Sequence, residues 1–318
     1  MAVPLFKSNV IAVIWDFDLT LIPGYQQDPL FDHYGIDARQ FWAEVNALTG
    51  IYRERGVEVS TDTVYLNHLL TYVAENKMPG LTNQKLRELG AQLVFYPGMP
   101  EFLDKTREHI EGNGRFQAQG ITVEHYVVST GIRQMIVGSA INTYVKGIWA
   151  SDFIEDPVPS GYASNPPAPQ PGAAISQVAY FLDNTTKTRA IWEINKGCNV
   201  DASIHVNSFI ALEDRRVPLR NMLYVADGPS DIPVFSILNQ YGGRTMGVYN
   251  PGDQKYFANV KALSDQGRIN WAAPADYSES SPAWLWVMST LDDIAERIVI
   301  DRERALSDRV HPPTRHVT

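Results

Sequence analysis

Residues 10–20 read VIAVIWDFDLT, an unbroken apolar run that ends in two aspartates separated by one residue. An apolar run of this length predicts a strand buried on both faces, which is typical of the centre of a parallel sheet. Because side chains alternate along a strand, we expect Asp16 and Asp18 side by side on the same face. Two carboxylates so close require a cation, a shared proton or a lysine beside them. Ligands of open α/β sheets bind just beyond the carboxyl ends of the strands, so the pair marks a candidate site.

Composition and charge narrow the class of protein. The chain has 318 residues, of which 44% are hydrophobic, and its formal net charge is −9. That charge argues against binding to nucleic acid or to an anionic membrane, which both require basic patches. The single cysteine, Cys198, excludes an intramolecular disulfide and a zinc site built on several cysteines. The sequence contains no recognisable signal peptide or membrane-length apolar run, so we expect a cytoplasmic protein. It leaves the oligomeric state open.

The chain divides into two parts by the period of its apolar residues. Helical spacing over residues 40–48, 63–75 and 82–93 predicts three helices without a strand, and Asp37, Thr61 and Thr82 are placed to cap them. We therefore predict a helical cap domain over residues 25–94. Residues 1–24 and 95–318 are expected to form an α/β core, in which the helical domain is inserted after the first strand and lies over the aspartates as a lid.

Strand and helix patterns alternate through the rest of the core. Strands are expected at 121–129, 145–150, 178–182, 222–226 and 245–249, and helices at 100–110, 132–141, 188–195, 231–238 and 283–305. This alternation predicts a doubly wound parallel sheet with helices on both faces. The stretch 156–172 is rich in proline and glycine, which favours a loop or flap.

Three further segments carry polar chemistry at the predicted strand ends: Ser129-Thr130-Gly131, Lys187 at the start of a helix, and Asp227-Gly228-Pro229-Ser230-Asp231. If the strands are parallel, four carboxylates meet at one edge of the sheet with Ser129 and Lys187. Oxygen ligands alone favour a hard cation such as Mg²⁺. Ser129, Lys187 and the N–H groups at the helix starts near Gly131 and Lys187 suit the oxygens of a phosphate.

This ordered set of motifs resembles the haloacid dehalogenase superfamily of phosphohydrolases, and the helical insert resembles the C1-type cap of its phosphoserine-phosphatase-like branch. The resemblance implies a Rossmann-like core and a two-step hydrolysis. Asp16 would attack phosphorus and become an aspartyl-phosphate, while Asp18 would protonate the leaving oxygen and then activate water. In dehalogenase members the second aspartate is replaced, so its presence here favours phosphate chemistry.

The resemblance also implies the remaining roles. Mg²⁺ would be held by Asp16, the backbone carbonyl of Asp18 and Asp227, with Asp231 in support. Ser129 and Lys187 would stabilise the phosphoryl oxygens, and Thr130 and Gly131 would join them in binding substrate.

For several residues the sequence alone allows two different roles. Lys196 competes with Lys187 for the role of catalytic lysine, but Lys187 leads its helix, where a phosphate would lie. Arg53 is a candidate substrate anchor, although the acidic neighbours Glu54 and Glu58 favour a solvated helix face. Asp231 is also placed to cap a helix. His125 lies in a predicted strand and is expected to be packed.

The expected function is an Mg²⁺-dependent phosphatase acting on a small phosphorylated metabolite. The absence of an acid between Ile22 and Asp28 argues against phosphoserine itself as the substrate. A phosphotransferase of the same superfamily is one alternative. A non-hydrolytic phospho-accepting or binding protein is another, because receiver domains also combine clustered aspartates with a Ser/Thr and a Lys. The chain length and the position of the acid pair on the first strand favour the enzyme.

Overall fold

A central sheet of seven strands organises the molecule. The computed structural model describes residues 8–162, 168 and 172–309, and it orders the strands β4-β3-β2-β1-β5-β6-β7. Their bounds are β1 (Val10–Trp15), β2 (Thr122–Ile132), β3 (Gly147–Ile154), β4 (Gln177–Tyr180), β5 (Met222–Ala226), β6 (Arg244–Tyr249) and β7 (Trp271–Pro274). Every pairing is parallel except that of β4 with β3. The predicted α/β class with a parallel sheet is confirmed, and the antiparallel edge strand β4 is the difference.

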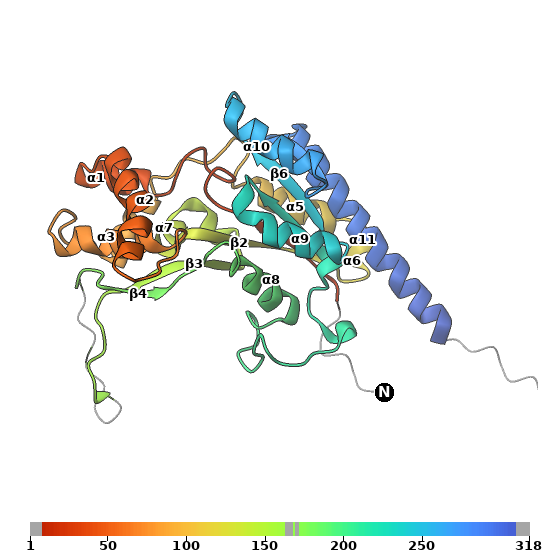
Figure 1. Cartoon of the computed structure of the whole chain (residues 1–318). Coiled ribbons are helices and arrows are strands. Elements are labelled where there is room, and N and C mark those ends of the chain that lie inside the picture. Colours follow the sequence, from red (N-terminus) through yellow and green to blue (C-terminus); the bar gives the residue numbers. More distant parts are fainter. Residues whose placement is uncertain (1–7, 163–167, 169–171, 310–318) are drawn as a thin grey trace, which may run out of the picture.

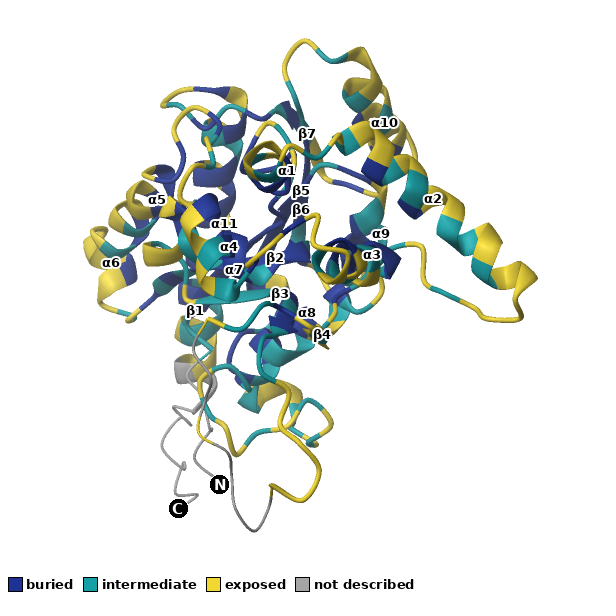
Figure 2. Ribbon diagram, turned by 90° about the vertical axis from the view of Figure 1, so that its left-hand side faces the viewer, coloured by how far each residue is buried: buried dark blue, intermediate teal, exposed yellow. Residues whose placement is uncertain are grey.

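The two faces of the sheet carry separate apolar cores. Alternate residues of β1 point to opposite sides: Val13 and Trp15 join one cluster and Ile14 the other. The first face is covered by α5 (Phe102–Glu111), α6 (Gly114–Gln117) and α11 (Pro282–Arg309), and the second by α8 (Lys187–Lys196), α9 (Ile232–Gln240) and α10 (Gln254–Asp265). Figure 2 shows the buried strands between these layers. Burial on both faces explains why β1 is apolar throughout.

Four helices occupy the stretch between Gly24 and Phe95, which is fully described and contains no strand. They are α1 (Asp28–Tyr34), α2 (Ala38–Glu54), α3 (Val64–Ala74) and α4 (Asn83–Gly90). Asp37 accepts from the N–H groups of Arg39 and Gln40, and Thr82 from that of Lys85, so these two predicted caps are present. The prediction for Thr61 is wrong: α3 starts at Val64, and the Thr61 hydroxyl donates to Asp62 instead.

The helical block is packed tightly on the core through α4 and α7 (Arg133–Gly138), which lie together in Figure 2. A Cβ on Gly90 would overlap the carbonyl oxygen of Met135, and a Cβ on Gly138 would overlap that of Arg87. Apolar side chains of α7 and β3, among them Met135 and Phe153, complete the cluster formed by the four helices. This block is grouped to one side of the sheet in Figure 1, at the end where β1 stops.

Some elements differ from expectation. The helix α1 of the helical block, the short helix α6, the helix α10 and the strand β7 have no counterpart among the sequence predictions. The proline-rich stretch 156–172 connects the antiparallel strands β3 and β4, although part of it lies outside the described residues. The position of residues 311–318 at the end of the sequence predicts a frayed tail, and these residues also lie outside the described ones. No helix in the described part of the chain combines the length and the apolarity needed to cross a bilayer.

Candidate active site

Three carboxylates gather beyond the carboxyl ends of the two central strands. β1 ends at Trp15, and the N–H of Asp16 continues the pairing by donating to the carbonyl of Val225 at 2.9 Å. Asp227 follows β5 directly, one position beyond the residue that the parallel register sets level with Asp16. With Asp231, these residues offer three carboxylate oxygens that all lie within 4.8 Å of one another.

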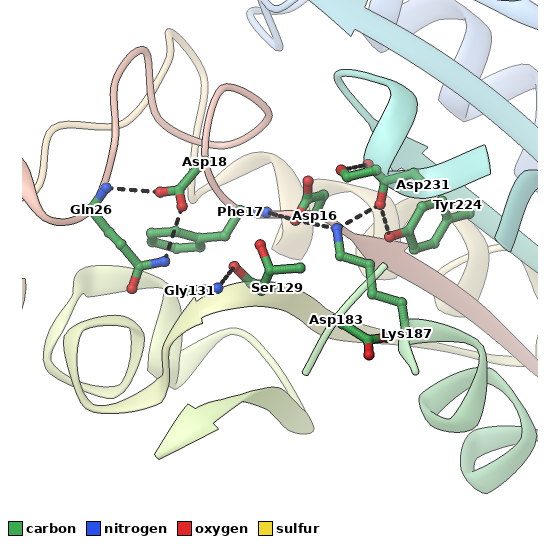
Figure 3. A network of polar contacts seen from close by, with 12 residues as sticks. Asp16, Phe17, Asp18, Gln26, Ser129, Gly131, Asp183, Lys187, Tyr224 and Asp231 are labelled. Atoms are coloured by element: carbon green, nitrogen blue, oxygen red, sulfur yellow. Dashed lines mark hydrogen bonds and ion pairs between the residues drawn. The ribbon is translucent and has the colours of Figure 1, made fainter. Parts of the chain in front are cut away.

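A buried lysine lies between two of these carboxylates. Nζ of Lys187 is 3.1 Å from Oδ1 of Asp16 and 2.7 Å from Oδ1 of Asp231, and the lysine side chain is fully buried (Figure 3). Burial lowers the pKa of Lys187, but the charges of Asp16 and Asp231 outweigh burial and raise the pKa above its ordinary value. Lys187 is therefore held as a cation. Lys196 lies elsewhere, donating to the carbonyls of Val206 and Ser208.

The turn before α8 sets the position of Lys187. Oδ1 of Asp183 accepts from the backbone N–H groups of Thr185 and Thr186, at 2.9 and 2.7 Å. The N–H of Lys187 then donates to the carbonyl of Asp183 at 3.0 Å. Asp183 is thus a structural contributor that the sequence analysis did not single out, although an aspartate two and three residues before threonines is a turn signal.

Asp231 holds the lysine and does not cap α9. Its Oδ1 also accepts from the hydroxyl of Tyr224 at 2.5 Å, and its Oδ2 from the hydroxyl of Ser230 at 2.8 Å. No side-chain cap bond joins it to α9, so the capping alternative is wrong. Tyr224 was not predicted, because a tyrosine in a buried strand gives no sequence signal of a polar partner.

Asp18 departs from the expected side-by-side arrangement. Since β1 stops at Trp15, the alternation of a strand no longer applies at Asp18, and Leu19 after it has a left-handed φ of 58°. The carboxylate of Asp18 turns away from Asp16 toward Gln26 in Figure 3. It is not part of the cluster of three carboxylates. The prediction that four carboxylates converge is therefore corrected to three, with Asp18 beside them.

Gln26, which the sequence did not single out, is the principal partner of Asp18. Its backbone N–H donates to Oδ1 of Asp18 at 2.8 Å, and its Nε2 donates to Oδ2 at 3.2 Å. Burial nevertheless raises the pKa of Asp18 to about 6, against the effect of these two hydrogen bonds. A carboxyl group with this pKa can both give and take a proton near neutral pH.

The Ser129-Thr130-Gly131 motif lies at the end of β2, next to this group. Ser129 is buried, and its Oγ accepts from the N–H of Gly131 at 3.0 Å, which leaves its own proton free to donate. The carbonyl of Thr130 accepts from the hydroxyl of Tyr65 on α3, at 2.9 Å. The N–H of Ile132 donates to Oε1 of Gln26. The N–H groups of Gly131 and Ile132, just before α7, are thus paired within the protein.

Arg53 does not join the site. It lies in the last turn of α2, where its side chain is 66% exposed and pairs with Glu58 at 3.7 Å. This is the solvated helix face that its acidic neighbours indicate, so the structure gives Arg53 no contact with the motifs.

The charges of the cluster fit a divalent cation. Burial and the charge of Asp231 raise the pKa of Asp16, and the same causes raise the pKa of Asp227 to about 7. Three carboxylates with one lysine leave an excess of buried negative charge, which costs free energy unless a cation or protons compensate it. Because every ligand atom is oxygen, the group is suited to a hard divalent ion.

Comparison with known proteins places the chain among its relatives. No protein-family model matches it. An uncharacterized protein of Borreliella burgdorferi is 37% identical over 289 residues, which cover 90% of this chain and 98% of that protein. Among solved structures, a haloacid dehalogenase family hydrolase of Salmonella enterica serovar Typhi aligns with a TM-score of 0.48 at 11% identity, over 83% of this chain and 67% of the other. A phosphoserine phosphatase with a phospho-aspartyl intermediate analogue aligns with a TM-score of 0.46 at 13% identity, over 83% and 93%.

The relation to the Borreliella burgdorferi protein extends over nearly the full length of that protein. In the structure, Asp16, Ser129 and Lys187 lie close together (Figure 3), and Asp227 belongs to the carboxylate cluster around Asp16. The chain therefore belongs to the family of this Borreliella burgdorferi protein.

Proposed function

We propose that the protein is an Mg²⁺-dependent phosphatase that hydrolyses a small phosphomonoester through an aspartyl-phosphate on Asp16. The observation that carries this proposal is the buried Lys187, held between Asp16 and Asp231 beside a second, separately oriented acid, Asp18. One group is arranged to attack phosphorus and another to move protons. Residues 25–94 are proposed to form the lid over this site, in a cytoplasmic enzyme.

The first step is phosphoryl transfer to the protein. A carboxylate oxygen of Asp16 forms a bond to phosphorus while the bond from phosphorus to the leaving oxygen breaks. Asp18 gives its proton to that oxygen, so the product leaves as an alcohol. The N–H of Phe17 and Nζ of Lys187 both contact Oδ1 of Asp16, at 2.8 and 3.1 Å, and orient its carboxylate. The ammonium group of Lys187 and the hydroxyl of Ser129 supply donors for the phosphoryl oxygens.

The second step returns the enzyme to its starting state. Asp18, now a carboxylate, takes a proton from water, whose oxygen attacks phosphorus as the bond to Asp16 breaks. Inorganic phosphate leaves, and Asp18 is protonated again. Mg²⁺ would be held by Asp16, Asp227 and the backbone carbonyl of Asp18, with Asp231 in support. When bound, it would neutralise charge and so let the anionic carboxylate approach an anionic phosphate.

The test is hydrolysis of p-nitrophenyl phosphate by the wild type and by Asp16→Asn, each with Mg²⁺ and with EDTA. We expect release of p-nitrophenol that requires Mg²⁺ and disappears in the variant. Release that survives in Asp16→Asn contradicts the proposed nucleophile. Stable labelling of Asp16 by acetyl phosphate without turnover indicates a phospho-accepting protein instead. Turnover that requires an added alcohol acceptor indicates a phosphotransferase.

A further inference from the structure

We propose that Gln26 is a positioning residue that fixes the carboxyl group of Asp18 in the orientation needed for proton transfer to the leaving group. This inference deepens the proposed function and rests on it. Gln26 comes from the loop that leads into α1, whereas Asp18 follows β1, so the contact joins the start of the helical block to the acid of the site.

Both oxygens of Asp18 are held by the same residue. The backbone N–H of Gln26 donates to Oδ1 at 2.8 Å, and Nε2 donates to Oδ2 at 3.2 Å. Oε1 of Gln26 accepts from the N–H of Ile132 at 2.8 Å, and the glutamine side chain is fully buried. A flipped amide would set two donors against each other at Ile132 and two acceptors against each other at Asp18. The orientation of the amide is therefore determined by its neighbours.

Gly131 makes room for this arrangement. A Cβ at position 131 would overlap Nε2 of Gln26 and lie 2.5 Å from its Cδ. Its backbone φ is not in the left-handed region, so the requirement for glycine is one of space and not of conformation. The glutamine and the glycine form an interlocked pair at the end of β2.

Asp18 needs such support because its own backbone does not supply it. It lies outside β1, and the following Leu19 has a positive φ, which surrounding contacts must maintain in a residue with a Cβ. A general acid works only within hydrogen-bond reach of the atom that it protonates. Release of Gln26 would let the carboxyl group rotate among staggered positions, and only a fraction of molecules would have it aimed at the leaving oxygen.

The experiment compares Gln26→Met with Gln134→Met on two substrates. Methionine keeps the length of glutamine and the backbone N–H bond to Oδ1 of Asp18, but it removes the side-chain bonds to Oδ2 of Asp18 and to Ile132. Gln134 is the matched control, because it is also buried and its amide contacts Arg87 and Asp152 instead of Asp18. p-Nitrophenyl phosphate and phenyl phosphate have leaving groups of similar shape. Phenoxide is the more basic of the two, so its departure depends strongly on a proton from Asp18, whereas p-nitrophenoxide leaves readily without one. Circular dichroism and thermal melting verify that each variant is folded.

We expect kcat/KM of Gln26→Met to fall about 10- to 100-fold for phenyl phosphate and about threefold or less for p-nitrophenyl phosphate, as part of the ~10²–10⁴-fold that general acid catalysis contributes. We compare kcat/KM because it covers only the steps up to departure of the leaving group, whereas kcat also includes hydrolysis of the aspartyl-phosphate, in which Asp18 acts as a base for both substrates alike. Asp18→Asn is expected to show the same selectivity with a larger loss. Equal losses on both substrates, or a selectivity no greater than that of Gln134→Met, would overturn the role of Gln26 while leaving the phosphatase intact. Absence of Mg²⁺-dependent turnover in the wild type would overturn both proposals.

A second variant tests the interlock without changing Gln26. Gly131→Ala should expel the glutamine amide and reproduce the selective loss on phenyl phosphate. In a Gln26→Ala background the added methyl group has space, so the same substitution should change kcat/KM for phenyl phosphate about twofold or less. This non-additive result would indicate direct contact between the two residues. Additive losses in the double variant would contradict the interlock.

Discussion

Nε1 of Trp15 donates a hydrogen bond to Nδ1 of His125 at 3.1 Å, inside the core and across 110 positions of sequence. Nδ1 must therefore be the unprotonated nitrogen of a neutral ring. The other nitrogen, Nε2, lies 2.8 Å from the hydroxyl of Thr106 and 3.1 Å from the carbonyl of Leu103. Burial, together with the charge of Arg107, lowers the pKa of His125 to about 3. The histidine is packed, as the sequence indicates, and has no place in the site.

This histidine makes stability depend on pH. The unfolded chain takes up the proton near its ordinary pKa of about 6.5, whereas the folded protein resists protonation until about pH 3. Lowering the pH through this window therefore favours unfolding, by about 1.4 kcal/mol per pH unit at most. We expect His125→Asn to cost about 1–2 kcal/mol at pH 7 and progressively less as the pH falls. Urea unfolding of both proteins at several pH values checks this, and a difference that is independent of pH contradicts it.

Removing a carboxylate from the cluster should stabilise the metal-free protein. Because burial and Asp231 raise the pKa of Asp227 to about 7, its carboxylate costs stability above that pH, and the cost is relieved as the pH falls toward about 3.8. We expect Asp227→Asn to melt a few degrees higher than the wild type in EDTA at pH 8. Addition of Mg²⁺ should raise the melting temperature of the wild type and have little effect on the variant. A variant that melts lower than the wild type in EDTA would show that the Asp227 carboxylate does not cost stability. A variant that responds to Mg²⁺ like the wild type would show that Asp227 does not bind the ion.

Substitution of each candidate lysine should show which one is needed for turnover. Lys187→Met leaves Asp16 and Asp231 without their buried cation, and breaking a buried pair in this way costs about 3–5 kcal/mol. It also removes a donor for the phosphoryl oxygens, so we expect kcat for p-nitrophenyl phosphate to fall by about 10²-fold or more. Lys196→Met, the matched control, loses only contacts to loop carbonyls and should retain turnover. Comparable activity in the two variants would exclude Lys187 as the catalytic lysine.

The close packing of α4 on α7 can be measured with glycine substitutions. Gly138→Ala forces a methyl group into the carbonyl of Arg87, so we expect a loss of about 1–3 kcal/mol or more in the free energy of unfolding. Gly50→Ala in α2 is the control. It meets no atom within 4 Å and should stabilise the protein by about 0.5–1 kcal/mol, because alanine favours a helix interior. Urea titrations measure both, and equal effects would show that α4 and α7 are not in rigid contact.

The sheet could be predicted because its strands are buried on both faces. β1 and β5 consist of apolar residues bounded by polar ones, a pattern that few other structures require. β7 was missed because it is only four residues long, and its first residue, Trp271, is partly exposed. The sequence also did not predict the direction of β4, because a strand of four residues at the sheet edge has no pattern that distinguishes antiparallel from parallel pairing.

The site shows the same division between local pattern and tertiary packing. Asp16, Asp227 and Lys187 lie where strand ends and a helix start place them, so their convergence followed from topology alone. Gln26 and Tyr224 contact Asp18 and Asp231 because the chain turns back between them, and no local sequence pattern signals either contact. Asp18 shows how the period of a strand misleads once the strand has ended.

The shared apolar cluster of the helical block bears on protein engineering. If residues 25–94 form the proposed lid, exchanging them for the corresponding segment of a related protein is a natural way to alter substrate preference. Here the hydrophobic contacts of that block are completed by Met135 on α7 and Phe153 on β3, outside the transferred segment. A graft limited to residues 25–94 would leave apolar surface exposed on both the transferred block and the remaining core. A working chimaera must carry α7 and the end of β3 with the cap, which makes the exchangeable module discontinuous in sequence.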